Sequence, residues 1–195
     1  MIRVQRAYVA RHGRTVLNAD DRLRGLSDPP LDHVGIAEAA RLAEVLATKH
    51  PKVVISSPLQ RAVATAQAIG AAARAPVVID GRLNDRDYGP WTAQPRAEVV
   101  RRYGSIDAAP GVEPLAAVAS RARTAFDQLT GEYAGPLVLV SHDAVNRALL
   151  AQLDPSLTDI GQRTACWNEL IRVDGAWRIE GYDLKPDQPE VDSGI

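Results

Sequence analysis

The chain has 195 residues, enough for one domain with a substantial hydrophobic core. Its formal net charge is −1, so no global field favours nucleic acid or an anionic membrane surface. Its one cysteine, Cys166, excludes an intramolecular disulfide and a zinc site built from cysteines. Any affinity for an anion must therefore come from a local group of side chains.

No apolar stretch approaches the roughly 20 residues that a membrane-spanning helix needs. The apolar run that follows Arg3 and Arg6 is also too short for the core of a signal peptide. We therefore expect a cytoplasmic protein that binds neither a membrane nor nucleic acid.

The first predicted element is a buried strand over residues 5–10, which stops abruptly at Arg11, His12 and Gly13. This cluster suits an anion, because the Arg11 guanidinium matches phosphate oxygens and Gly13 lets backbone N–H groups approach a ligand. A surface turn with incidental charges is the alternative interpretation of the same residues.

Residues 11–31 form a long polar loop, which in a compact domain is usually functional or disordered. Asp32 has the character of an N-cap, and the apolar positions that follow it have helical spacing up to Leu46. Pro51 is expected to end that helix, and a second buried strand covers residues 52–55.

Ser57 and Pro58 predict a helix start, with the serine as N-cap and the proline at the first helical position. Arg61 lies one turn inside this helix, so its side chain can return toward the end of the preceding strand. The helix is expected to reach the region of Gly70, and residues 77–79 form a third short strand.

The rest of the chain continues the alternation of helices and strands. The predicted elements are an irregular segment over 80–112 with a short helix at 96–103, a helix over 115–129, a buried strand over 136–140 that ends at Ser141-His142-Asp143, a helix over 144–153, and a hairpin of 165–173 and 177–182 around Asp174-Gly175.

This alternation predicts an α/β fold in which helices flank a largely parallel sheet that can include one antiparallel strand. We expect a single domain over residues 1–185 and a flexible tail over 186–195. In such sheets the functional site lies at the carboxyl ends of the strands. Three of these ends bring polar groups: Arg11 to Gly13, Ser57 with Arg61, and Ser141 with His142.

Two histidines and two arginines at one sheet edge make a site for a phosphoryl group. Arginine forks neutralise its oxygens and stabilise the charge that develops on them during transfer. One imidazole can attack phosphorus and form a covalent intermediate. An acid must then protonate the leaving oxygen.

The sequence resembles the histidine phosphatase superfamily, the phosphoglycerate-mutase-like proteins, over residues 5–150. Four blocks match in order: Arg11-His12-Gly13-x-Thr15-x-x-Asn18; Gly25-x-x-Asp28-x-Pro30-Leu31 followed by Gly35; Ser56-Ser57-Pro58-Leu59-x-Arg61-Ala62-x-x-Thr65-Ala66; and Ser141-His142 with Asn146-Arg147. The resemblance implies the three-layer sandwich of that family.

The resemblance also implies roles for the matching residues. His12 is the implied nucleophile, Arg11 and Arg61 are the phosphate clamps, and His142 is the second active-site histidine. Further substrate contacts are implied for Gly13, Asn18, Arg86 and Tyr88. Asn18 could instead brace the loop together with Thr15 through hydrogen bonds, and Arg86 and Tyr88 could equally serve loop packing.

Two departures from the family concern the proton donor. The family has a glutamate where this chain has Asp85, within Leu83-Asn84-Asp85-Arg86-Asp87-Tyr88-Gly89. Asp143 stands where close relatives have glycine, and it creates a His-Asp pair similar to the one that supplies the proton in the acid-phosphatase branch. Asp85 is our first choice of donor, and Asp143 is the alternative.

Other conspicuous residues receive structural interpretations. Arg22 and Arg24 are expected to lie in a solvated loop, with substrate contact as the alternative, and His33 and His50 to face solvent. Trp91 is expected to cap the irregular segment, and Cys166 to be a small core residue. The four histidines have no metal-ligand spacing and no nucleotide-binding motif is present, so we expect neither a metal nor a cofactor.

These observations predict a phosphomonoesterase of the histidine acid type that releases inorganic phosphate from a small phosphorylated metabolite. The alternatives are a mutase, against which the little room in residues 92–112 argues, and a catalytically weak protein that binds a phosphorylated ligand. The sequence does not identify the substrate. Specificity is expected to lie in the loops 14–31 and 83–112, which a single sequence constrains little. The hairpin over 165–182 could supply a sheet edge for a homodimer.

Overall fold

A computed structural model of the chain describes residues 5–186, so most of the predicted tail lies outside the described part. Its strands are β1 (Gln5–Arg11), β2 (Val53–Ser56), β3 (Val77–Ile79), β4 (Leu137–Ser141), β5 (Trp167–Val173) and β6 (Ala176–Leu184). Its α-helices are α1 (Val16–Ala19), α2 (His33–Ala47), α3 (Gln60–Ala73), α4 (Arg96–Tyr103), α5 (Leu115–Glu132) and α6 (Asp143–Leu153). Two short 3₁₀ turns, η1 (Gly81–Leu83) and η2 (Gly89–Trp91), interrupt the segment before α4.

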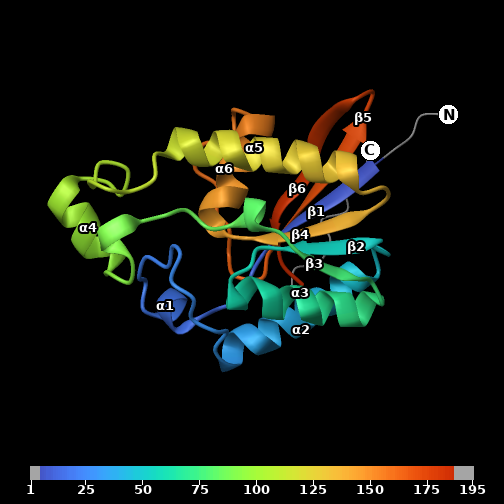
Figure 1. The fold of residues 1–195 in the computed structure, drawn as a ribbon, viewed down its shortest axis with the longest axis horizontal. Coiled ribbons are helices and arrows are strands. Elements are labelled where there is room, and N and C mark those ends of the chain that lie inside the picture. The colour runs from blue at the N-terminus through green and yellow to red at the C-terminus, as the bar shows by residue number, and fades with distance from the viewer. Residues whose placement is uncertain (1–4, 187–195) are drawn as a thin grey trace.

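The strands form one sheet in the order β3-β2-β4-β1-β5-β6 (Figure 1). Neighbours among β3, β2, β4 and β1 are parallel, whereas β5 pairs antiparallel with both β1 and β6. The predicted mostly parallel α/β sheet with one antiparallel strand is therefore confirmed.

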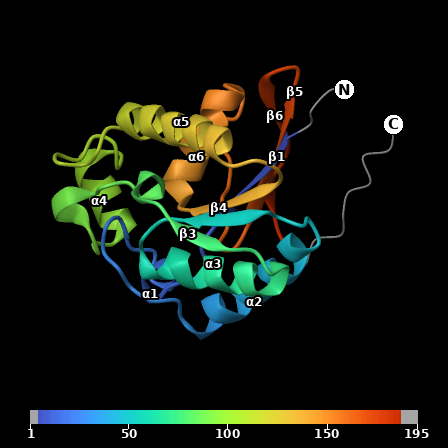
Figure 2. The ribbon, with the colours of Figure 1, turned by 45° about the vertical axis from the view of Figure 1, so that its right-hand side comes forward.

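Helices cover both faces of the sheet and make three layers (Figure 2). Along β4, Leu137 and Leu139 point into the core beneath α5 and α6, while Val138 and Val140 point into the core above α2 and α3. This alternation follows from the two-residue period of a strand, and both faces are apolar because both are covered. Within residues 5–186, no helix is long and apolar enough to cross a membrane.

A third, smaller apolar cluster lies beyond the carboxyl end of the sheet, in the lobe that carries α4 (Figure 1). Leu23 from the first loop packs there against Tyr88, Val99 and Ile106 from the segment around α4. Trp91 packs on this cluster and its indole N–H donates to the Pro110 carbonyl at 2.7 Å, so its predicted capping role is confirmed. The cluster joins the two loops that were expected to set specificity.

One unpredicted helix and the ends of two others differ from the predictions. The loop 11–31 contains the one-turn helix α1, closed by reciprocal hydrogen bonds between Thr15 and Asn18. Helix α2 ends at Ala47, four residues before Pro51, and α5 continues through Gly131 to Glu132. Glycine costs only about 1 kcal/mol inside a helix, which packing along the rest of α5 offsets.

The start of α3 also differs. Ser57 is not its N-cap, because the helix begins at Gln60 and the cap residue Leu59 makes no side-chain hydrogen bond. Instead, the Asp28 carboxylate accepts the Gln60 backbone N–H at 2.6 Å, from a loop distant in sequence. A carboxylate at this end also complements the helix dipole.

Replacing Asp28 by alanine is therefore expected to lower the free energy of unfolding by about 1 kcal/mol, as the loss of a helix cap does. Urea unfolding followed by circular dichroism measures the change. Asp20→Ala, at an exposed acidic position of the same loop, serves as the control. Equal effects of the two substitutions would contradict a capping role for Asp28.

Candidate active site

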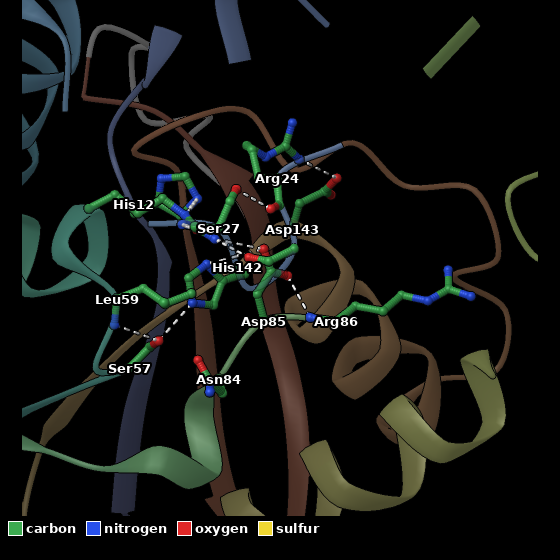
Figure 3. A network of polar contacts seen from close by, with 12 residues as sticks. His12, Arg24, Ser27, Ser57, Leu59, Asn84, Asp85, Arg86, His142 and Asp143 are labelled. Carbon is green, nitrogen blue, oxygen red and sulfur yellow. Dashed lines mark hydrogen bonds and ion pairs between the residues drawn. The ribbon is translucent and has the colours of Figure 1, made fainter. Parts of the chain in front are cut away.

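His12 and His142 are brought together by the pairing of neighbouring parallel strands. In the register of β1 with β4, Arg11 lies opposite Ser141. The next residue of each strand, His12 and His142, therefore lies at the same edge of the sheet, and their ring centroids are 5.2 Å apart. The predicted meeting of these strand ends is confirmed (Figure 3).

The backbone around His12 fixes which of its ring nitrogens is free to react. Its Nδ1 lies 2.7 Å from the Gly13 carbonyl oxygen, which can only accept, so Nδ1 carries the proton and Nε2 carries the lone pair. The ring is buried, and burial together with the positive charge of Arg61 holds the pKa of His12 well below its ordinary value. His12 is therefore neutral near pH 7, as a nucleophile must be.

Besides fixing the tautomer of His12 through its carbonyl, Gly13 has a packing role. A side chain there would collide with the Gly35 carbonyl, so the glycine permits β1 to approach the start of α2. Its own backbone N–H donates to Thr65 Oγ1 at 3.1 Å. The predicted contact of Gly13 with a ligand stays a prediction.

Arg61 is the fully buried centre of the cluster. From the first turn of α3 its Nε donates to His12 Nε2 at 3.2 Å, and one terminal nitrogen donates to Asp85 Oδ2 at 2.9 Å. The carbonyls of Gly25 and Ser27 accept from the guanidinium at 2.8 and 2.7 Å. Its predicted return toward the strand end is confirmed, and it touches both the nucleophile and the candidate acid.

The two candidate acids occupy different environments. Asp85 Oδ2 lies 3.6 Å from His142 Nδ1, so this carboxylate sits between Arg61 and the second histidine. Asp143 instead lies 3.0 Å from Arg147 Nε and 4.0 Å from a terminal nitrogen of Arg24. The geometry thus favours Asp85 as the group that faces the reacting atoms.

His142 is oriented by the hydroxyl of Ser57. The same hydroxyl accepts the Leu59 backbone N–H at 3.4 Å, so Ser57 lies beside the start of α3 without being its N-cap. Nε2 of His142 lies 2.8 Å from Ser57 Oγ, and its buried Nδ1 has no hydrogen-bond partner within residues 5–186. Burial, and then the charges of Arg61 and Arg11, hold the pKa of His142 well below its ordinary value. A neutral ring with one nitrogen anchored presents the other to a ligand.

Arg11 and Arg24 line a pocket of about 410 Å³ beside this cluster. Arg24 is only 6% exposed, so the predicted solvated position is wrong; it is held inward because Leu23 before it is buried in the α4 lobe. Within the described residues, the Nε atoms of both arginines are buried without a hydrogen-bond partner. Phosphoryl oxygens are suitable acceptors for such groups.

The other residues predicted to contact substrate, Asn18, Arg86 and Tyr88, make hydrogen bonds or ring contacts elsewhere in the structure. Asn18 lines the same pocket, but its Oδ1 accepts from Thr15 in the cap of α1. The Arg86 side chain points away from the histidines in Figure 3 and donates to the Glu113 carbonyl at 2.8 Å and to Asp107 at 2.6 Å. The Tyr88 ring lies 5.5 Å from its guanidinium carbon, so both residues border a neighbouring space.

The structural interpretations of four other residues have mixed outcomes. His33 and His50 are exposed and Cys166 is fully buried, as predicted. Arg22 is partly buried and donates to the Ala93 carbonyl at 2.8 Å, so it ties the first loop to the segment before α4 instead of extending into solvent.

Comparison with known proteins agrees with this geometry. The sequence model of the histidine phosphatase superfamily (branch 1) matches residues 7–185. The chain belongs to this superfamily. The match extends past the four sequence blocks and includes the β5–β6 hairpin of this histidine phosphatase.

Two curated relatives represent different activities within the superfamily. The glucosyl-3-phosphoglycerate phosphatase of Mycolicibacterium vanbaalenii is 36% identical over 215 residues, covering 93% of this chain and 96% of that protein. A 2,3-bisphosphoglycerate-dependent phosphoglycerate mutase of Gloeobacter violaceus is 35% identical over 162 residues, covering 75% of this chain and 74% of that protein.

A solved structure of a mycobacterial glucosyl-3-phosphoglycerate phosphatase superposes with a TM-score of 0.81 at 27% identity, covering 94% of this chain and all of that one. The phosphoglycerate-mutase-like sandwich implied by the sequence is thus confirmed.

The buried position of His12 generates a test by NMR. Its imidazole should titrate with a pKa below about 6.5, the ordinary histidine value, because burial and Arg61 oppose its protonation. Since the unfolded chain takes up this proton at higher pH, stability should also fall as the pH drops below about 6.5. An imidazole transition centred above that value would contradict the neutral nucleophile.

Proposed function

We propose that this protein is a phosphoric monoester hydrolase of the histidine acid type, which acts on small phosphomonoesters through a phosphohistidine on His12. One observation carries the proposal. The free Nε2 of His12 faces Arg61 at 3.2 Å, and the carboxylate that pairs with Arg61 also faces His142. A nucleophile, a clamp and an acid therefore share one buried site.

Binding places the phosphoryl group among donors that point into the site. Arg11, Arg24 and Arg61 bring positive charge, and Nδ1 of His142 adds a hydrogen bond when the Ser57 hydroxyl donates to Nε2. These donors are fixed before the ligand arrives, which is the condition under which they stabilise the transition state strongly.

In the first step, His12 Nε2 attacks phosphorus and the P–O bond to the leaving group breaks. The Nε–H of Arg61 then turns from His12 to a phosphoryl oxygen. Asp85, in its protonated form, gives its proton to the leaving oxygen, and Arg61 and the Arg86 backbone N–H stabilise the carboxylate that results.

In the second step, water attacks the phosphohistidine and the P–N bond breaks. The Asp85 carboxylate accepts the proton that water loses, which restores both residues and releases inorganic phosphate. The name of the mycobacterial relatives makes glucosyl-3-phosphoglycerate a candidate substrate.

The mutase relative makes isomerisation the second candidate function. The two activities separate in one assay, in which the protein is incubated with 3-phosphoglycerate and 2,3-bisphosphoglycerate. A phosphatase releases inorganic phosphate, whereas rapid isomerisation without net phosphate release would overturn the proposal. A protein that binds phosphate but hydrolyses none of a panel of esters would favour a binding role instead.

Substitution of the two acids tests the assignment of the proton donor. Asp85→Asn should lower kcat/KM by about 10²–10⁴ for an alkyl phosphate, the usual contribution of a general acid. It should affect p-nitrophenyl phosphate far less, because that leaving group needs no proton. Asp143→Asn is the matched control, and a leaving-group effect confined to it would transfer the role to Asp143.

A further inference from the structure

The segment that carries Asp85 belongs to no helix or strand. It connects the two 3₁₀ turns η1 and η2, and the backbone of residues 84–88 between them is irregular. The position of such a segment depends on contacts from outside it, because no ladder or helical turn of its own pairs its backbone groups. The contacts that hold residues 84–88 therefore also determine where the Asp85 carboxylate points.

Arg121 of α5 supplies the contacts at Asp85 itself. Its two terminal nitrogens donate to the backbone carbonyls of Asn84 and Asp85, both at 2.9 Å. The guanidinium is also paired side-on with Glu113, whose carboxylate oxygens lie 2.7 Å from Nε and 3.0 Å from a terminal nitrogen. A planar fork held at two points has little freedom to turn, so its other donors stay aimed at the segment.

Glu113 holds the next part of the same segment. Its backbone N–H donates to the Asp87 carbonyl at 2.8 Å, and its carboxylate accepts the Asp87 backbone N–H at 3.1 Å. Its own carbonyl accepts from Arg86 Nε at 2.8 Å. Arg121 and Glu113 thus form one clamp, which holds the chain from Asn84 to Asp87.

The peptide bond between Asp85 and Arg86 transmits this hold to the carboxylate. The N–H of that peptide donates to Asp85 Oδ1 at 2.8 Å, and its carbonyl is the one that accepts from Arg121. Because a trans peptide is planar, with N–H and C=O pointing in opposite directions, fixing the carbonyl also fixes the N–H. Oδ1 is thereby anchored, and Oδ2 is left facing Arg61 at 2.9 Å and His142 Nδ1 at 3.6 Å.

Arg121 acts on the carboxylate through the backbone and not by touching it. The residue lines a groove beside α5, on the opposite side of the segment from the pocket that Arg11 and Arg24 line. Its charge is paired with Glu113, so its contribution is to hold a peptide in place.

We propose that Arg121, held by Glu113, is a positioning residue for the proton donor: it fixes the peptide after Asp85 and thereby aims the Asp85 carboxylate at the leaving oxygen. This inference rests on the proposed phosphatase function, in which Asp85 protonates that oxygen. Loss of the Arg121 guanidinium should therefore weaken the step that needs a proton, while attack by His12 is preserved.

Two aryl esters with the same ring separate this role from a general structural one. Phenyl phosphate releases a phenol, which needs the proton, whereas p-nitrophenyl phosphate releases an anion that does not. A general acid contributes about 10²–10⁴, so Arg121→Met should lower kcat/KM for phenyl phosphate by at least about tenfold and for p-nitrophenyl phosphate by less than about twofold. Arg121→Lys keeps a donor for the carbonyls and should recover part of the loss.

Arg82→Met is the matched control. Arg82 also ties the segment to α5, and its side chain is 33% exposed against 31% for Arg121. Its guanidinium donates to side chains, the Asp80 and Glu132 carboxylates among them. The substitution removes a cation between η1 and α5 but leaves the clamp intact, so the ratio of the two kcat/KM values should not change.

The link to the acid is tested by combining substitutions. In the Asp85→Asn background, Arg121→Met should cost less than about twofold more on phenyl phosphate, since residues that act as a unit are not additive. Circular dichroism establishes that each variant is folded. If Arg121→Met does not fold, Arg121→Lys is judged by the same two comparisons.

Two results would overturn the inference. One is an equal loss on both esters in the Arg121 variants, and the other is a full additional loss in the Asp85→Asn background. If the natural protein hydrolyses neither ester, the proposed function fails. If it hydrolyses both, and Asp85→Asn shows the leaving-group effect while the Arg121 variants do not, only this inference fails.

Discussion

The burial of one cation, Arg61, is the constraint on which the rest of the site depends. A guanidinium removed from water is costly unless its donors are satisfied. Here a carboxylate, two loop carbonyls and the His12 ring accept from it. The same bonds that offset its burial therefore fix the first loop, orient the nucleophile and place Asp85. The contacts that satisfy the buried guanidinium are thus the same contacts that hold the site together.

The parallel pairing of β1 and β4 is the second constraint. It sets His12 beside His142 with no contribution from either side chain. The helices that follow β2 and β4 then add to the surroundings of this pair, since α3 brings Arg61 and α6 begins directly after His142. The sheet edge thus fixes the relative position of the two histidines.

The mostly parallel sheet, the histidine pair and Arg61 could be predicted because apolar strands that end in polar residues are local signals. Ser57 could not, because Ser-Pro is a good helix start and its actual partner, His142, lies 85 residues away. The burial of Arg24 was equally hidden, since it follows from packing of Leu23 in a distant lobe. The capping of α3 by Asp28 could not be predicted either, because Asp28 lies in a different loop, 32 residues before Gln60. Local patterns cannot show contacts that only the fold creates.

The most direct test of this account is to trap the intermediate. Rapid acid-free quenching of the protein during turnover of a ³²P-labelled ester, followed by peptide mapping, should place the label on the peptide that contains His12. The bond should be labile to acid and stable to base, as a phosphoramidate is, and His12→Ala should carry no label. Turnover with no labelled protein, or label on any other residue, would contradict it.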